Sequence, residues 1–215
     1  MRRLVTAAVA AGLLVAAAPA LARPPIVWAP IPYGKARKAE MAAYSLRHYG
    51  RRTWHLAPRV IVLHFTDGPS YASARATFAG NTPAPGPAGS APELPGTCAH
   101  FVIDQRGRIY QLVSLHVRCR HTIGLNHVAI GIEMVQDSLG RGGHWADLQI
   151  LHRKRQLRSA LRLVRYLQAR FHILTKNVVG HATANRSHYF RDREGWTNDH
   201  DDWVAPDVAA FKRLL

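Results

Sequence analysis

Two apolar segments that each end in a histidine constrain the fold of this chain more than any other feature. The first is Ile61-Val62-Leu63-His64, and the second is Val178-Val179-Gly180-His181. Because β-branched residues favour strands, we expect each histidine at the end of a buried strand, with its side chain in a shared cleft. An acidic tail ending in Thr197-Asn198-Asp199 follows the second segment. Two imidazoles and a carboxylate would make an open zinc site.

A third segment places one carboxylate inside an otherwise apolar strand. Its sequence is Ala129-Ile130-Gly131-Ile132-Glu133-Met134. Burying an unpaired carboxylate is costly, so we predict that Glu133 is present for chemistry. The alternative is that Glu133 forms a buried ion pair with one of the many arginines.

The first residues have the pattern of an export signal. Arg2 and Arg3 form a basic start, residues 4–18 are apolar, and Ala20-Leu21-Ala22 offers small residues for cleavage. We predict a secretory signal peptide over residues 1–22 and a periplasmic, secreted or wall-associated mature protein. The apolar run is short and alanine-rich for a membrane span, although an uncleaved anchor is the alternative.

The formal net charge of +16 predicts attraction to polyanions, including nucleic acid, anionic lipid and acidic cell-wall polymers. Export argues against nucleic acid as the partner. The alternative is that the arginines only solvate the surface.

The two cysteines, Cys98 and Cys119, flank a predicted hairpin with strands over 99–104 and 108–113. In an oxidising compartment they are enough for one disulfide, which we favour over free thiols.

The remaining pattern predicts one α/β (α+β) domain, with helices flanking a single mixed central sheet. Residues 23–57 are expected to form an extended Pro-rich lead and a helix over 35–49, and residues 58–215 the main domain. Further helices are predicted over 71–78, 148–171 and 207–214, and strands over 60–65, 128–135 and 177–180. The segment 80–96 is so rich in Pro, Gly and Ala that we predict a loop shaping a substrate rim.

In this order, these segments resemble the type 2 N-acetylmuramoyl-L-alanine amidases, a zinc family that includes peptidoglycan recognition proteins and amidase-type phage lysozymes. The resemblance rests on the motifs around His64, Glu133 and His181, on Arg120-His121-Thr122 leading to Asn126, and on the hairpin of residues 99–113. It extends over roughly residues 59–203.

The resemblance implies one zinc ion held by His64, His181 and an acidic residue of the tail, for which we choose Asp199. Asp192, His188 and His200 are rival third ligands. Glu133 would be the general base, Thr197 would stabilise the oxyanion, and His121 and Asn126 would line the substrate groove. The tail departs from the family pattern, since residues 182–196 are longer than usual and Asp199 is not followed by Pro-Gly.

The implied function is hydrolysis of the amide bond between the lactyl group of N-acetylmuramic acid and L-alanine in peptidoglycan. The expected partners are therefore peptidoglycan and muropeptides, and we expect a monomer. The alternative is a peptidoglycan-binding protein of the same fold that does not hydrolyse its ligand.

Overall fold

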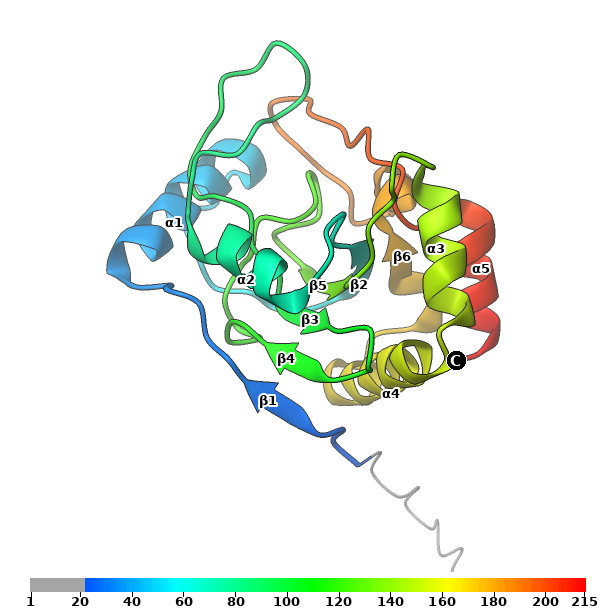
Figure 1. Ribbon diagram of the computed structural model, residues 1–215. Coiled ribbons are helices and arrows are strands. Elements are labelled where there is room, and N and C mark those ends of the chain that lie inside the picture. The colour runs from blue at the N-terminus through cyan, green and yellow to red at the C-terminus, as the bar shows by residue number, and fades with distance from the viewer. Residues whose placement is uncertain (1–21) are drawn as a thin grey trace, which may run out of the picture.

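The computed structural model describes residues 22–215, and its centre is a six-stranded sheet (Figure 1). The strands are β1 (Ile26–Trp28), β2 (Val60–Phe65), β3 (Phe101–Ile103), β4 (Ile109–Gln111), β5 (Ala129–Met134) and β6 (Val178–Gly180). They lie in the order β1-β4-β3-β5-β2-β6, and only the β3–β4 hairpin is antiparallel. The predicted signal peptide lies outside the described residues except for Ala22.

Strands β2 and β5 form the centre of the sheet, and all of their residues are buried. A parallel strand covered on both faces has few polar residues, which explains the nearly continuous apolar sequence of each. Ile61, Leu63 and Phe65 contribute to the large core on one face. Because side chains alternate along a strand, His64 points to the other face, and Glu133 is its paired neighbour on β5.

Helices cover both faces of the sheet. On one face, α3 (Gly143–His152), α4 (Lys154–Phe171) and α5 (Ala205–Arg213) supply apolar residues to the large core. Figure 1 shows α3 and α5 side by side, with α4 running beneath the sheet. On the other face, α2 (Tyr71–Ala79) places Phe78 in a second core that includes the two cysteines. The helix α1 (Lys35–Tyr49) packs Met41, Tyr44 and Tyr49 together.

The predicted helix over 148–171 is wrong in one respect, because two helices occupy this region. α3 begins at Gly143 and ends at His152, and Arg153 leaves the helical conformation at φ −83° and ψ 83°. Its guanidinium donates to Gln136 Oε1 and to Gln156 Oε1, each at 2.7 Å. The apolar periodicity continues across this break, so periodicity alone does not detect it. The break allows α3 to pack against α5 while α4 covers the sheet.

The other predicted elements are confirmed to within a few residues, and so is the single mixed sheet flanked by helices. The extended lead supplies β1, which pairs in parallel with β4. The division of the chain at residue 57 stays a prediction. Across residues 22–215, none of the helices has the length and apolar character needed to cross a membrane.

Candidate metal centre

His64, His181 and Asp202 form a compact buried group at one edge of the sheet. Leu63 pairs with Gly180 across the parallel strands β2 and β6, so the residues that follow, His64 and His181, emerge side by side. Asp202 arrives from the tail after η2, the 3-10 helix His181–Arg186. Its carboxylate oxygens lie 3.1 Å from His64 Nδ1 and 3.0 Å from His181 Nδ1. One ligand atom from each residue lies within 4.8 Å of the others.

The backbone around Asp202 is fixed from two sides. The Ala182 N–H donates to the Asp202 carbonyl at 2.8 Å, which ties the tail to the residue after His181. The Asp147 carboxylate of α3 accepts from the N–H groups of Trp203 and Val204, each at 3.0 Å. Trp203 is fully buried against Gly180, where a Cβ would overlap it. The glycine before His181 therefore permits the approach of the tail that brings Asp202 into place.

The outer nitrogen of each histidine also has a partner. His64 Nε2 lies 3.1 Å from His121 Nδ1, and His181 Nε2 lies 3.0 Å from Asn198 Oδ1. Asn198 is oriented by its Nδ2 group, which donates to the Ile123 carbonyl at 2.9 Å. Metal binding through both Nδ1 atoms would place the protons on Nε2. The His181 proton then faces Asn198 Oδ1, and the His64 proton faces His121 Nδ1, which accepts when His121 carries its own proton on Nε2, 3.4 Å from the Ala129 carbonyl. Such outer hydrogen bonds fix the tautomer and ring orientation of metal-binding histidines.

Glu133 is buried beside this group, with 7% of its surface exposed. Its Oε2 atom has no hydrogen-bond partner among the described residues. Burial, followed by the negative charge of Asp202, raises the pKa of Glu133 well above its ordinary value. The ion pair with an arginine that we considered as an alternative is not formed, since no ion pair of the described chain includes Glu133. A cation nearby would offset the cost of burying this carboxylate.

The charges of the group suit metal binding. Burial lowers the pKa of His64 to about 4, more than the Asp202 hydrogen bond raises it, so the imidazole is neutral at pH 7. Burial opposes the ionisation of Asp202, but His181 and His64 hold the pKa of this carboxyl well below its usual range. Neutral imidazole nitrogens and an ionised carboxylate oxygen are zinc ligands, and three of them leave one position open. The donor set therefore fits a catalytic zinc ion.

A cavity of about 330 Å³ opens onto these groups. Its wall includes His64, His121, Glu133, His181, His200 and Asp202. Phe78 and Thr97, which flank the loop predicted to shape a rim, also line it, whereas the loop interior does not. His200 stacks on His181, with ring centroids 4.1 Å apart. The arrangement can hold a cation, a small polar ligand and a proton acceptor in one place.

The structure separates the candidates that we named for the third ligand. Asp199 is exposed and outside the group, so we replace it with Asp202, which the sequence reasoning missed. Asp192 instead lies 2.8 Å from His48 Nδ1, and His188 lines a different cavity. His200 lines the cavity but is not in the group of three. His200 stands two residues before Asp202, as Thr197 stands two residues before Asp199. This repeated spacing is the sequence signal that could have identified Asp202 as a candidate ligand.

The other predicted site residues lie in different places. His121 reaches the cavity wall and contacts His64. Asn126 is fully buried and does not line the cavity; its Oδ1 accepts from the N–H groups of His121 and Thr122, each at 2.8 Å. We therefore assign it to holding this turn rather than to substrate contact. Thr197 is exposed and is not part of the cavity wall.

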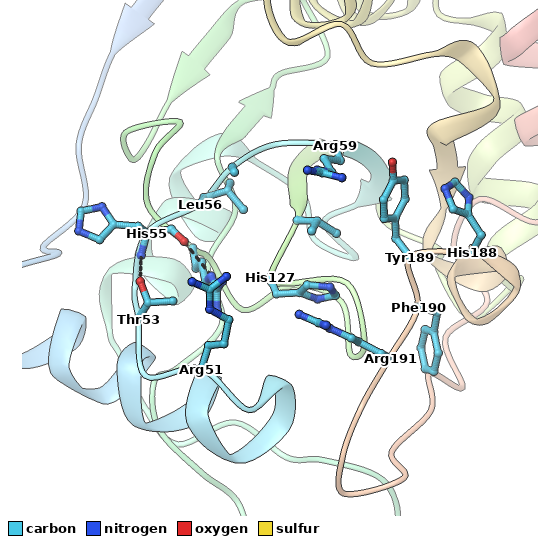
Figure 2. A pocket seen from close by; sticks show the side chains of 13 residues that line it. Arg51, Thr53, His55, Leu56, Arg59, His127, His188, Tyr189, Phe190 and Arg191 are labelled. Atoms are coloured by element: carbon cyan, nitrogen blue, oxygen red, sulfur yellow. Dashed lines mark hydrogen bonds between the residues drawn. The ribbon is translucent and has the colours of Figure 1, made fainter.

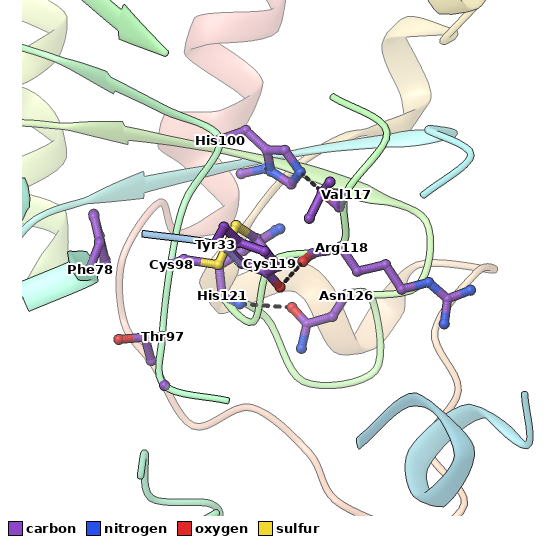
Figure 3. The surroundings of a disulfide bond; sticks show 12 residues. Tyr33, Phe78, Thr97, Cys98, His100, Val117, Arg118, Cys119, His121 and Asn126 are labelled. Atoms are coloured by element: carbon purple, nitrogen blue, oxygen red, sulfur yellow. Dashed lines mark hydrogen bonds between the residues drawn. A yellow bond between two sulfur atoms is a disulfide. The ribbon is translucent and has the colours of Figure 1, made fainter. Parts of the chain in front are cut away.

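The predicted disulfide is confirmed, with Cys98 bonded to Cys119 (Figure 3). It joins the residue before the β3–β4 hairpin to the loop that carries His121. His100 lies beside it, donating from Nε2 to the Val117 carbonyl at 2.9 Å and accepting at Nδ1 from the Gly131 N–H at 3.1 Å. The absence of a side chain at Gly131 leaves room for the His121 ring, since a Cβ would lie 2.8 Å from it.

A family model described as N-acetylmuramoyl-L-alanine amidase matches residues 54–202. No curated protein matches the sequence.

Among solved structures, the endolysin N-acetylmuramoyl-L-alanine amidase LysCS from Clostridium intestinale URNW is 17% identical, with a TM-score of 0.50. The match covers 88% of this chain and 96% of that chain. A mutant endolysin from Bacillus subtilis is 22% identical, with a TM-score of 0.48 and coverage of 74% and 84%. The E. coli amidase AmiD, solved with a muropeptide substrate, is 22% identical, with a TM-score of 0.43 and coverage of 59% and 49%. The similarity to LysCS supports the fold.

Proposed function

Because the chain belongs to the N-acetylmuramoyl-L-alanine amidase family, we propose that it is a zinc-dependent enzyme that cleaves peptidoglycan. The bond is the amide between the lactyl group of N-acetylmuramic acid and L-alanine. The observation that carries this proposal is the placement of His64, His181 and Asp202 within 4.8 Å of one another, beside the unpartnered carboxylate of Glu133. A protein that only binds peptidoglycan has no need of this combination.

His64, His181 and Asp202 would hold the zinc ion. When bound, zinc lowers the pKa of water to about 7 and polarises a carbonyl oxygen. The carboxylate of Glu133, which lines the cavity, takes the proton of the attacking water and passes it to the leaving nitrogen of L-alanine.

His200 takes the position that we had assigned to Thr197. It lies two residues before Asp202 and lines the cavity, whereas Thr197 is outside it. A neutral imidazole carries one N–H donor, which is available to the oxygen that becomes negative when the amide carbon turns tetrahedral. We therefore propose His200 as the side chain that stabilises this oxygen.

We also propose that the protein is exported by residues 1–22 and acts in the cell envelope. The bridge between Cys98 and Cys119 supports this location, because disulfides persist in oxidising compartments. Muropeptides and peptidoglycan are the proposed substrates.

The test is mass spectrometry of purified peptidoglycan after incubation with the protein from Arg23 onward. The protein is used as isolated, after chelation, and after zinc is restored. We expect free stem peptides that begin with L-alanine, lost on chelation and recovered with zinc. Intact wall that sediments with the zinc-loaded protein would instead identify a binding protein without hydrolase activity.

A further inference from the structure

A second cavity, of about 700 Å³, lies at the opposite ends of β2 and β5 from the metal centre. Arg59 directly precedes β2, and His127 and Val128 directly precede β5; all three line this cavity. A strand rises about 3.3 Å per residue, so His64 lies roughly 13 Å further along β2 than Val60. Figure 2 shows Arg51 and His55 on one side of the space and His127, Tyr189 and Arg191 on the other. The two cavities share no lining residue.

The wall of this cavity carries concentrated positive charge. Arg51, Arg59, Arg118 and Arg191 line it, and its lining contains no aspartate or glutamate. None of these four guanidinium groups forms an ion pair within the described part of the chain. In the part of the chain that the structure describes, the arginines that form ion pairs are Arg47 and Arg120, both with Glu93. Four positive charges therefore line one cavity without a carboxylate of the described chain to offset them.

Two of the lining side chains are buried and incompletely bonded. Arg118 and His127 are each 6% exposed, and Arg118 Nη1 and His127 Nδ1 have no hydrogen-bond partner among the described residues. Burial lowers the pKa of Arg118 to about 10, which leaves it charged at neutral pH. A buried charge is costly unless a group of opposite charge lies close to it, so the Arg118 guanidinium favours an anion in the cavity.

The buried guanidinium is also held in a fixed place. Arg118 Nε donates to the His55 carbonyl at 2.9 Å, and its backbone N–H donates to the Trp54 carbonyl at 2.9 Å. The Tyr49 ring is a neighbour of both buried groups, with its centroid 4.5 Å from that of the His127 ring and 6.0 Å from the Arg118 guanidinium carbon. A donor that is ordered before binding loses little conformational entropy on binding, which favours a specific site over a diffuse basic surface.

We propose that this cavity binds a phosphate group; when the phosphate is part of an ester, the organic part lies against Tyr189 and Phe190. Planar guanidinium groups match phosphate oxygens in pairs, and a doubly charged anion balances several arginines better than a single carboxylate. The space is larger than one phosphate ion needs, and Leu56, Tyr189 and Phe190 give part of it an apolar wall. The source is either the free ion or a phosphate-containing polymer of the cell envelope.

The test is calorimetric titration with inorganic phosphate and, separately, with poly(glycerol phosphate), at fixed ionic strength. The test variant is Arg51→Gln/Arg191→Gln, which leaves the buried Arg118 in place so that folding is preserved. The matched control is Arg158→Gln/Arg213→Gln, which removes the same charge from exposed positions on α4 and α5. A His64→Ala protein controls for phosphate bound at the metal centre.

We expect the test variant to bind inorganic phosphate at least tenfold more weakly than the wild type, while the control double variant and His64→Ala bind it normally. If the test variant also loses poly(glycerol phosphate) binding, the polymer is a source of the phosphate group. If its polymer binding is unchanged, the ligand of this cavity is the free phosphate ion. Equal phosphate affinity in all four proteins, or a loss confined to His64→Ala, would overturn the proposal.

Discussion

At the scale of single residues, the choice between two aspartates of the tail decides the metal centre. Asp202 bridges the Nδ1 atoms of both histidines, whereas Asp199 is exposed. We predict that Asp202→Asn lowers zinc affinity by at least about 100-fold, because a neutral amide replaces an anionic ligand between His64 and His181. The matched change Asp199→Asn should leave zinc content and activity unchanged. Competition with a chelator measures both affinities, and zinc lost from the Asp199 variant alone would return that residue to the ligand set.

Glu133 differs from Asp202, because it is proposed to act on the substrate without holding the metal. Glu133→Gln keeps the shape of the side chain and removes its basicity. We predict normal zinc content and a fall in kcat of about 100-fold or more, the range typical for loss of general base catalysis. Elemental analysis and muropeptide turnover measure the two effects separately. Turnover that survives the substitution would exclude the general-base role.

His100 links stability to pH. Its two hydrogen bonds fix the neutral form, and burial lowers its pKa from 6.5 to about 4. As the pH falls, His100 therefore takes up a proton in the unfolded chain at a higher pH than in the folded protein. Its contribution to the free energy of unfolding is complete above pH 6.5 and is lost as the pH falls toward 4. We predict that His100→Gln reduces the slope of unfolding free energy against pH by about 1.4 kcal/mol per pH unit in this range. Urea unfolding of both proteins in chelator measures the slopes, and identical slopes would contradict the assignment.

At the scale of elements, the disulfide joins two segments that the sheet does not hold together. It closes a loop with a sequence separation of 21 residues, so the chain-entropy model gives it about 3 kcal/mol of stability. We predict that Cys98→Ala/Cys119→Ala lowers the Tm by about 6–12 °C. Calorimetry of the variant and of the reduced wild-type protein should give similar Tm values. A variant as stable as the oxidised wild type would show that the bridge adds nothing to the fold.

The elements that the sequence predicted well are those in which a local pattern and the packing agree. The apolar runs of β2 and β5 are buried on both faces, and α1 ends at Tyr49, directly before Gly50, whose φ of 73° suits a glycine after a helix end. The break at Arg153 escaped prediction because it depends on a contact with Gln136, which lies in the loop between β5 and α3. Asp202 escaped because Gly180, Trp203 and Asp147 position it through the tertiary structure.

At the scale of the whole molecule, the positive charge should govern how the protein meets an acidic cell wall. The formal net charge is +16, and attraction at long range is screened as salt rises. We predict that the rate of attack on intact wall bearing anionic polymers falls about tenfold or more between 0.01 and 1 M salt. Hydrolysis of an uncharged, soluble muropeptide amide should change little over the same range, which provides the control. Equal salt dependence for both substrates would place the effect in the active site instead.

The pairing of β2 with β5 has a consequence for how this sequence can change. His64 and Glu133 are neighbours on one face because the two strands are parallel and in step over all six residue pairs. Removing or adding one residue within either strand would turn the side chains beyond that point to the opposite face. In related sequences, these two strands should therefore show many substitutions of one apolar residue for another and no change in length. Insertions and deletions should instead accumulate in the loops between them.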